Sequence, residues 1–178
     1  MKIYLISGKA RHGKDTIANY LKEYYKDQNK KACIMHIGNY IKHFAKDYFE
    51  WDGKEETKPR TLLQQLGTNV IREKMNKPYF FTNRLLEDME VLEHFFDVFI
   101  IADVRLPLEI DEIVKKYSDT VLIRVKRYDF DDGMNEEQRM HVTETALDDY
   151  SSFKYYLDNL TLDKLKEDVY RLASEEEE

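Results

Sequence analysis

The chain has 178 residues, of which 42% are hydrophobic, and a formal net charge of -7. Its length suits one domain spanning 1–178, and its apolar fraction supports a core, which excludes a disordered chain. No apolar run approaches the roughly 18 residues of a membrane span, and no export leader precedes the first apolar run, so we expect a cytoplasmic protein. The negative charge disfavours extended nucleic-acid binding, which needs a basic face. Cys33 is the only cysteine, which excludes an internal disulfide.

The start of the chain predicts a strand, a glycine-flanked loop and a helix. The apolar run Ile3–Ile6 is followed by Gly8, and apolar residues recur at helical spacing from Ile17 onward. Gly8, Gly13 and Lys14 have the spacing G-x-x-x-x-G-K, in which backbone N–H groups converge on an anion. The helix N-terminus adds about half a positive charge at the same point. We expect Lys14 to reach the outer phosphates of a nucleoside triphosphate.

Asp15 stands where most such loops have Ser or Thr, whose hydroxyl holds Mg²⁺. A carboxylate also suits Mg²⁺, directly or through water. Alternatively, Asp15 is only an acid at a helix N-terminus, where it interacts favourably with the helix dipole. Thr16, one residue further, can offer its hydroxyl or N–H to an inner phosphate.

Four more strands and several helices follow in alternation. The strands are expected at 31–37, 95–103, 121–125 and 155–157. The helices are expected at 39–50, 59–74, 78–92, 107–117 and 162–172. Pro59, Pro78 and Pro107 each stand where a helix can begin, since a first-turn position needs no amide hydrogen. This order predicts a three-layer α/β/α sandwich with a five-stranded parallel sheet.

The stretch 38–94 between the second and third strands is rich in helix, and we interpret it as the part that binds a phosphoryl acceptor. Gly67 interrupts one of its helices at a cost near 1 kcal/mol relative to alanine, which suggests close packing or close approach of a ligand. Lys42, in the first turn after a strand, is a ligand candidate. The basic and amide residues of the stretch are Lys42, Arg60, Gln64, Gln65, Arg72 and Arg84.

Asp103 ends the most continuous apolar run of the chain, which indicates a strand buried on both faces of a parallel sheet. Ligands sit at the carboxyl ends of such strands, so Asp103 should lie beside the phosphate loop, where a carboxylate handles Mg²⁺. Alternatively, Asp103 is a strand-end cap. Arg105, two residues further, is placed to meet a phosphate.

The segment 126–147 is polar and lies between two sheet elements, so we interpret it as a mobile lid. Its possible phosphate ligands, together with the strand before it, are Arg124, Arg127 and Arg139. The acidic end of the chain, 174–178, is expected to be a solvated, fraying tail.

Four motifs resemble the P-loop kinases that phosphorylate deoxynucleoside monophosphates, the kind found in bacteriophages and prophages. They are Leu5–Thr16 with its unusual Lys-Asp-Thr, Leu62–Thr68, Ala102–Pro107 and His141–Asp149, and together they span most of the chain. Where that family commonly has Phe-Pro-Asn-Glu, this chain has Leu106-Pro107-Leu108-Glu109. P-loop phosphomevalonate kinases have a similar Gly-Lys-Asp loop and are the nearest competing acceptor class.

The resemblance implies the P-loop nucleoside triphosphate hydrolase fold in its NMP-kinase-like form. It also implies transfer of the γ-phosphate of ATP to a (deoxy)nucleoside monophosphate, with Mg²⁺. The donor would lie over Gly8, Lys9, Ala10, Arg11, His12, Gly13, Lys14, Asp15 and Thr16. Asp15 and Asp103 would organise the metal. The transferring phosphoryl group would meet Lys14, Arg105, Arg124 and Arg127, with Asp103 alternatively orienting the attacking oxygen. The acceptor phosphate would meet Lys42, Arg60 and Arg72, and its base or sugar Trp51 and Gln65.

A nucleotide-binding module that senses nucleotides without turnover is an alternative from another class, and Asp15 at the usual hydroxyl position is its best support. The partner in either case is a small nucleotide. Both a monomer and a homodimer are compatible with the sequence.

Overall fold

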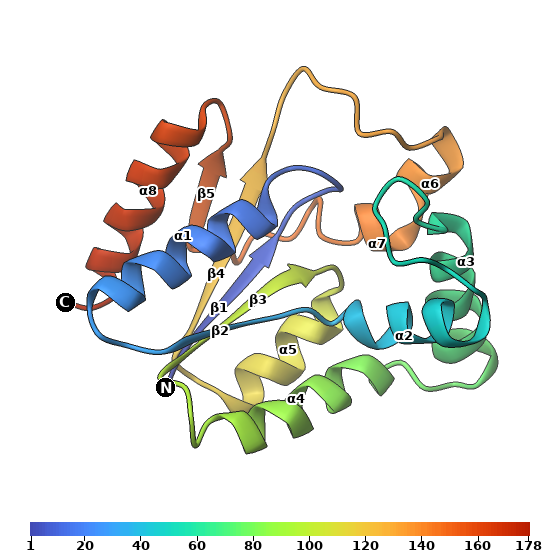
Figure 1. Cartoon of the computed structure of the whole chain (residues 1–178), viewed down its shortest axis with the longest axis horizontal. Coiled ribbons are helices and arrows are strands. Elements are labelled where there is room, and N and C mark those ends of the chain that lie inside the picture. Colours follow the sequence, from blue (N-terminus) through green and yellow to red (C-terminus); the bar gives the residue numbers. More distant parts are fainter.

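A computed structural model describes residues 1–178, and its core is one parallel sheet with the strand order β2-β3-β1-β4-β5. The strands are β1 (Lys2–Ser7), β2 (Ala32–Met35), β3 (Val98–Val104), β4 (Thr120–Lys126) and β5 (Tyr155–Asp158). Strand β1 lies at the centre and pairs in parallel with β3 and β4. The predicted five-stranded parallel sheet is confirmed, and Figure 1 shows helices on both of its faces.

Alternate side chains of the central strands enter two separate cores, one on each face of the sheet. Tyr4 and Ile6 pack with α1 (Lys14–Asp27) and α8 (Leu162–Glu175). Ile3 and Leu5 pack on the other face, against the helices α4 (Phe80–Leu92) and α5 (Pro107–Lys116). Because the strands are apolar on both faces, the sheet is covered twice, which confirms the three-layer sandwich.

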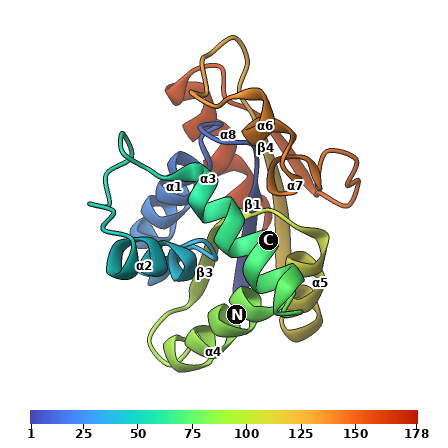
Figure 2. The same ribbon diagram turned by 90° about the vertical axis from the view of Figure 1, so that its right-hand side faces the viewer.

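The remaining helices gather at the carboxyl ends of the strands, on the right-hand side of Figure 1. They are α2 (Asn39–Tyr48), α3 (Arg60–Gln64), the π-helix η1 (Gln65–Lys74), α6 (Glu136–Met140) and α7 (Val142–Thr145). Figure 2, which turns this side toward the viewer, shows α3 with the continuing helix in front of the sheet. The stretches 38–94 and 126–147 therefore meet at the carboxyl ends of the strands.

The helix expected over 59–74 is α-helical only to Gln64 and then widens into the π-helix η1. Along this helix Ile71 is buried, whereas its neighbour Val70 is 38% exposed. A Cβ at Gly67 would lie 2.7 Å from Cδ1 of Ile41. The interpretation of Gly67 as a site of close packing therefore holds, since α2 approaches its backbone.

Two further sequence predictions need correction. Helix α4 begins at Phe80, so Pro78 lies in the turn before it rather than opening it. The acidic end is exposed as predicted except at Glu176, but it is not a free tail, because α8 continues to Glu175 and the next two acids have partners. Glu176 pairs with Lys2 at 3.4 Å, and Glu177 accepts a hydrogen bond from the Tyr25 hydroxyl at 3.2 Å.

The helices of the structure are all too short or too polar to span a bilayer.

Candidate active site

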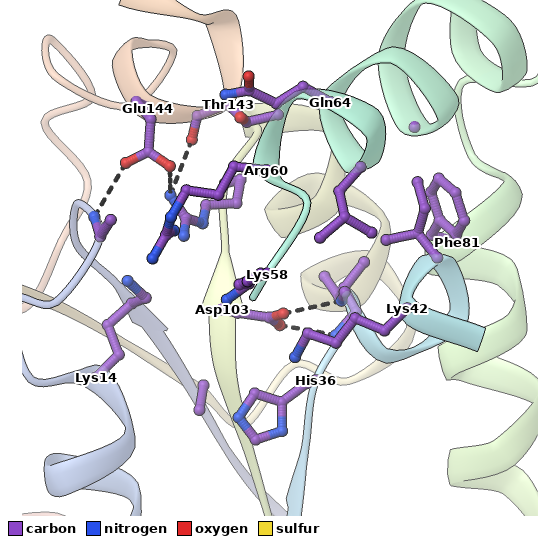
Figure 3. A pocket seen from close by; sticks show the side chains of 18 of the residues that line it. Lys14, His36, Lys42, Lys58, Arg60, Gln64, Phe81, Asp103, Thr143 and Glu144 are labelled. Carbon is purple, nitrogen blue, oxygen red and sulfur yellow. Dashed lines mark hydrogen bonds and ion pairs between the residues drawn. The ribbon is translucent and has the colours of Figure 1, made fainter. Parts of the chain in front are cut away.

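A cavity of about 480 Å³ opens between the glycine loop, the end of β3 and the helices α2, α3, η1 and α7. Its wall carries Lys14 and Asp15 from the loop and α1, and Asp103 and Arg105 from β3 and the residue after it. In Figure 3, Lys14 and Phe81 lie at opposite sides of this cavity, with Asp103 between them. Two segments that are distant in the sequence thus contribute these four charged side chains to one space.

The loop keeps its curl because both of its motif glycines are sterically required. Gly13 has φ 106°, a conformation that L side chains rarely adopt, and a Cβ there would meet the Asn159 amide. At Gly8, a Cβ would lie 2.8 Å from Cγ1 and from the carbonyl oxygen of Val125. The Asn159 amide donates a hydrogen bond to the His12 carbonyl at 3.0 Å, so the β5–α8 connection fastens the loop from outside.

Lys14 lies inside the curl of the loop and is only 7% exposed. Its Nζ donates to the carbonyl oxygens of Gly8 at 2.8 Å and Lys9 at 2.7 Å. Burial, followed by the nearby charge of Arg105, lowers the pKa of Lys14 to about 7. An anion at this point would favour the charged ammonium, because opposite charges stabilise each other.

Asp15 accepts a hydrogen bond from Nε2 of His36, which follows β2, at 2.7 Å. This hydrogen bond lowers the pKa of Asp15 and raises the pKa of His36. Both side chains line the cavity, so α1 and β2 are joined at its floor.

Asp103 accepts two backbone hydrogen bonds, from Ile37 N–H at 2.7 Å and from Gly38 N–H at 2.8 Å. The carboxylate therefore fastens the β2–α2 connection to the end of β3, which is the capping role that the sequence left open. Asp103 and Asp15 line the same cavity, although no group of three or more His, Cys, Asp or Glu side chains is arranged to hold a metal ion.

Arg105 and the loop are both bound by Glu144, on α7. Glu144 Oε2 accepts a hydrogen bond from Ala10 N–H at 3.0 Å, and Oε1 pairs with the Arg105 guanidinium. Figure 3 shows this carboxylate above Lys14. The segment expected to be a polar lid therefore ends inside the site, and Leu147, just beyond α7, belongs to the core.

The side of the cavity opposite Lys14 is basic and partly apolar. Lys42, Lys58 and Arg60 line it, and Glu55 pairs with Lys58 at 3.0 Å and with Arg60 at 2.6 Å. Arg72 stacks on Phe81 and pairs with Glu109, which is 1% exposed, at 2.9 Å. Burial lowers the pKa of Arg72 and raises the pKa of Glu109.

Several predicted site residues lie elsewhere. Gln65 is exposed and faces away from the cavity, because Gln64 occupies the inward position. Trp51 donates its Nε1–H to the Lys54 carbonyl within its own loop at 3.1 Å and does not line the cavity either. The assignment of Trp51 and Gln65 to the base or sugar therefore lacks support from their positions.

A second cavity, of about 400 Å³, lies on the other side of the loop and contains Arg124 and Arg127. Lys9 and His12 line it as well. The Arg124 guanidinium donates to Ser7 Oγ and to Asp148, each at 2.8 Å, so it is held beneath the loop. Thr16 and Arg139 line neither cavity, and Arg139 pairs with Asp132 at 2.7 Å.

Sequence reasoning gave no role to His36, Lys58, Glu109 and Glu144, all of which line the cavity. Glu144 lies within the motif His141–Asp149, which was the one available signal for it. Glu109 is the last residue of Leu106-Pro107-Leu108-Glu109, which is compared with the Phe-Pro-Asn-Glu of the family, but nothing there indicated its pairing with Arg72. His36 and Lys58 stand in stretches without a motif.

The model of the family "Deoxynucleotide monophosphate kinase" matches residues 24–169. No curated protein matches the chain. Among solved structures, a gluconokinase from Sinorhizobium meliloti 1021 is similar with a TM-score of 0.54 at 8% identity, over 98% of this chain and 92% of that one. A sugar kinase from Janibacter sp. HTCC2649 has a TM-score of 0.52 at 10% identity, over 96% and 93%. At such identities these two structures support the fold alone.

The family match covers more than half of the chain, and the loop that precedes it has the spacing G-x-x-x-x-G-K with both glycines sterically required. The chain therefore belongs to the deoxynucleotide monophosphate kinase family and is a phosphotransferase.

Proposed function

We propose that the chain moves the γ-phosphoryl group of ATP to the phosphate of a deoxynucleoside monophosphate, giving ADP and the diphosphate. The observation that carries this proposal is that Lys14, in its glycine loop, opens onto the same cavity as the cations of the 38–94 stretch. A phosphoryl transfer needs two anionic groups held in line, and one cavity with cations on both sides meets that requirement. A cytoplasmic location stays a prediction.

The donor triphosphate would lie over residues 8–16. Gly8 and Gly13 enforce the curl of the loop, and α1 begins directly after it at Lys14, so the loop amides and the helix N-terminus would both serve the phosphate oxygens. Mg²⁺ would be held by Asp15 and Asp103, whose carboxylates face one cavity and provide the hard oxygen ligands that this ion prefers. When bound, the ion would neutralise charge on the phosphate oxygens.

The acceptor would be held by the 38–94 stretch. Lys42 is the best candidate for its phosphate, because the only hydrogen bond of its ammonium is to Asn39, at 3.2 Å. Arg60 and Arg72 carry acidic partners already, so we assign Arg60 to the phosphate after exchange with Glu55 and Arg72 to the wall behind it. Lys58 and Gln64 are added to this group because they line the cavity.

Lys14 and Arg105 would stabilise the negative charge that develops on the transferring phosphoryl group. Arg127 and Arg124, in the second cavity, would approach the donor only from the opposite side of the loop, and the segment 126–147 would act as the lid. A monophosphate is already ionised near neutral pH, so the transfer needs no strong general base.

A coupled assay of ADP release tests the proposal. It uses the common ribo- and deoxynucleoside monophosphates as acceptors and phosphomevalonate as a control. We expect ADP release with at least one deoxynucleoside monophosphate and none with phosphomevalonate. Release only with phosphomevalonate would contradict the acceptor assignment. Nucleotide binding without release for any acceptor would favour a sensing module.

A further inference from the structure

Glu144 occupies a position at which its carboxylate binds two donors of the active site at once. One oxygen accepts the Ala10 N–H of the loop at 3.0 Å, and the other pairs with Arg105. Arg105 also donates to the neighbouring Thr143 carbonyl at 3.3 Å. The Glu144 side chain is only 7% exposed, so this carboxylate interacts with the protein rather than with solvent.

The segment that carries Glu144 touches both halves of the site. A Cβ at Gly133 would lie 2.9 Å from the Arg11 guanidinium, so the lid backbone rests on the next loop residue as well. The Gln138 side chain donates a hydrogen bond to the Thr61 hydroxyl at 3.2 Å, and the Gln138 backbone carbonyl accepts one from the Gln64 side chain at 3.4 Å. Thr61 and Gln64 both lie on α3. A displacement of the segment that carries Glu144 would therefore change contacts with the donor loop and with α3.

The two donors that Glu144 binds are of the kind that a phosphate requires. A single N–H group such as that of Ala10 cannot fully serve two oxygens. Arg105 has further N–H groups, but its positive charge is offset while it is paired with a carboxylate. A carboxylate kept this close to a triphosphate would also repel it, and the repulsion is strong where water is largely excluded.

We propose that Glu144 is an internal competitor of the donor phosphate. In this proposal, which rests on the proposed function, a phosphate oxygen takes over the Ala10 N–H and Arg105, and Glu144 withdraws with α7. Arg105 is then freed for the transferring phosphoryl group only when Glu144 has left. Glu144 is a positioning residue, since it acts through Arg105 and touches neither reactant during transfer.

The lid contacts on α3 connect this exchange to the acceptor. Gln138 and Gln64 are hydrogen-bonded on the acceptor side, so an acceptor that orders α3 also biases the segment on which Glu144 stands. The exchange thereby limits the use of ATP when water is the only acceptor. Removing the charge of Glu144 should weaken this coupling and tighten the binding of polyphosphate.

The test compares the wild type with Glu144→Gln by calorimetric titration with inorganic tripolyphosphate and with a non-hydrolysable ATP analogue. The glutamine keeps an oxygen for the Ala10 N–H but cannot pair with Arg105. We expect at least about fivefold tighter binding of both probes, the lower end of typical coupling strengths. Hydrolysis of ATP without acceptor should also rise relative to transfer.

Glu137→Gln is the matched control, because Glu137 lies on α6 of the same segment and is exposed. It makes the same change of charge and should leave both affinities within about twofold of the wild type, since exposed charges interact weakly. Equal or weaker polyphosphate binding by Glu144→Gln, as expected of a purely structural brace, would overturn the proposal.

A crystal structure of the wild type with the ATP analogue provides a second test that needs no variant to fold. We expect Ala10 N–H and Arg105 on phosphate oxygens, with Glu144 displaced from both. Glu144 still bound to both donors beside the analogue would overturn the inference. These outcomes are separate from the proposed function, which fails if the wild type transfers no phosphoryl group to any deoxynucleoside monophosphate.

Discussion

The basic side chains around the cavity differ in whether they already form an ion pair with a carboxylate. Arg72 is matched by Glu109 and Arg105 by Glu144, whereas the ammonium of Lys42 meets only an amide oxygen. Glu109 also accepts hydrogen bonds from the Arg105 and Leu106 N–H groups at 2.8 and 3.0 Å, at the start of α5. Glu109 therefore supports the wall of the site from behind.

We expect Glu109→Ala to lower the free energy of unfolding by about 3 to 5 kcal/mol, because it leaves a buried guanidinium without its partner. Urea unfolding measures this effect. Glu112→Ala on the same helix is the control and should cost no more than about 0.5 kcal/mol, since its ion pair with Lys115 is long, at 4.0 Å. A loss below about 1 kcal/mol for Glu109→Ala would show that the pair does not hold the wall.

Sequence reasoning found the residues of the site that belong to a local pattern. Lys14 and Asp15 follow from the loop motif, and Asp103 from its place after an apolar run. The contacts of Glu144 with Ala10 could not be predicted in this way, because these residues stand 134 positions apart. The capping role of Asp103 likewise depends on amides that come from the β2–α2 connection.

Among the elements, the C-terminal helix α8 differs most from its prediction. Glu176 alone is drawn against β5 and the start of β1, because Lys154 and Lys2 pair with it, whereas the other residues of 174–178 are exposed as predicted. The π-helix η1 is the other departure, since apolar spacing alone does not distinguish it from an α-helix. Both differences arise from partners that come from other parts of the chain.

The contacts of Glu176 predict a stability that depends on pH. Burial raises the pKa of Glu176, but hydrogen bonds from Lys154 and Tyr155 outweigh it and lower the pKa from 4.5. A lowered pKa adds stability above pH 4.5, and this contribution is lost as the pH falls through the value in the folded protein. Glu176→Gln should therefore cost up to about 1 kcal/mol at neutral pH and progressively less in acid.

Thermal unfolding from pH 7 down to pH 3 checks this prediction. Glu178→Gln, at the exposed last residue, is the control and should not change the pH dependence. A constant difference between the wild type and Glu176→Gln across this range would contradict it.

On the scale of the whole molecule, the sheet and its two cores were predictable because each strand carries its burial pattern in its own sequence. The sheet order β2-β3-β1-β4-β5 then brings the loop after β1 and the end of β3 together at one edge. The meeting of 38–94 with the lid segment above this edge depends on side-chain contacts between distant segments. The architecture thus follows from local patterns and the cavity does not.

The central claim is that Lys14 and its loop hold the polyphosphate of a donor whose γ-phosphoryl group goes to a deoxynucleoside monophosphate. Phosphorus NMR of ATP mixed with the deoxynucleoside monophosphates measures this transfer directly. Wild type and Lys22→Ala, a change at an exposed position of α1, should both produce ADP and the deoxynucleoside diphosphate. Lys14→Ala should lower the rate at least about a hundredfold, because charge stabilisation of the transition state is lost. Transfer by Lys14→Ala near the wild-type rate would contradict the account.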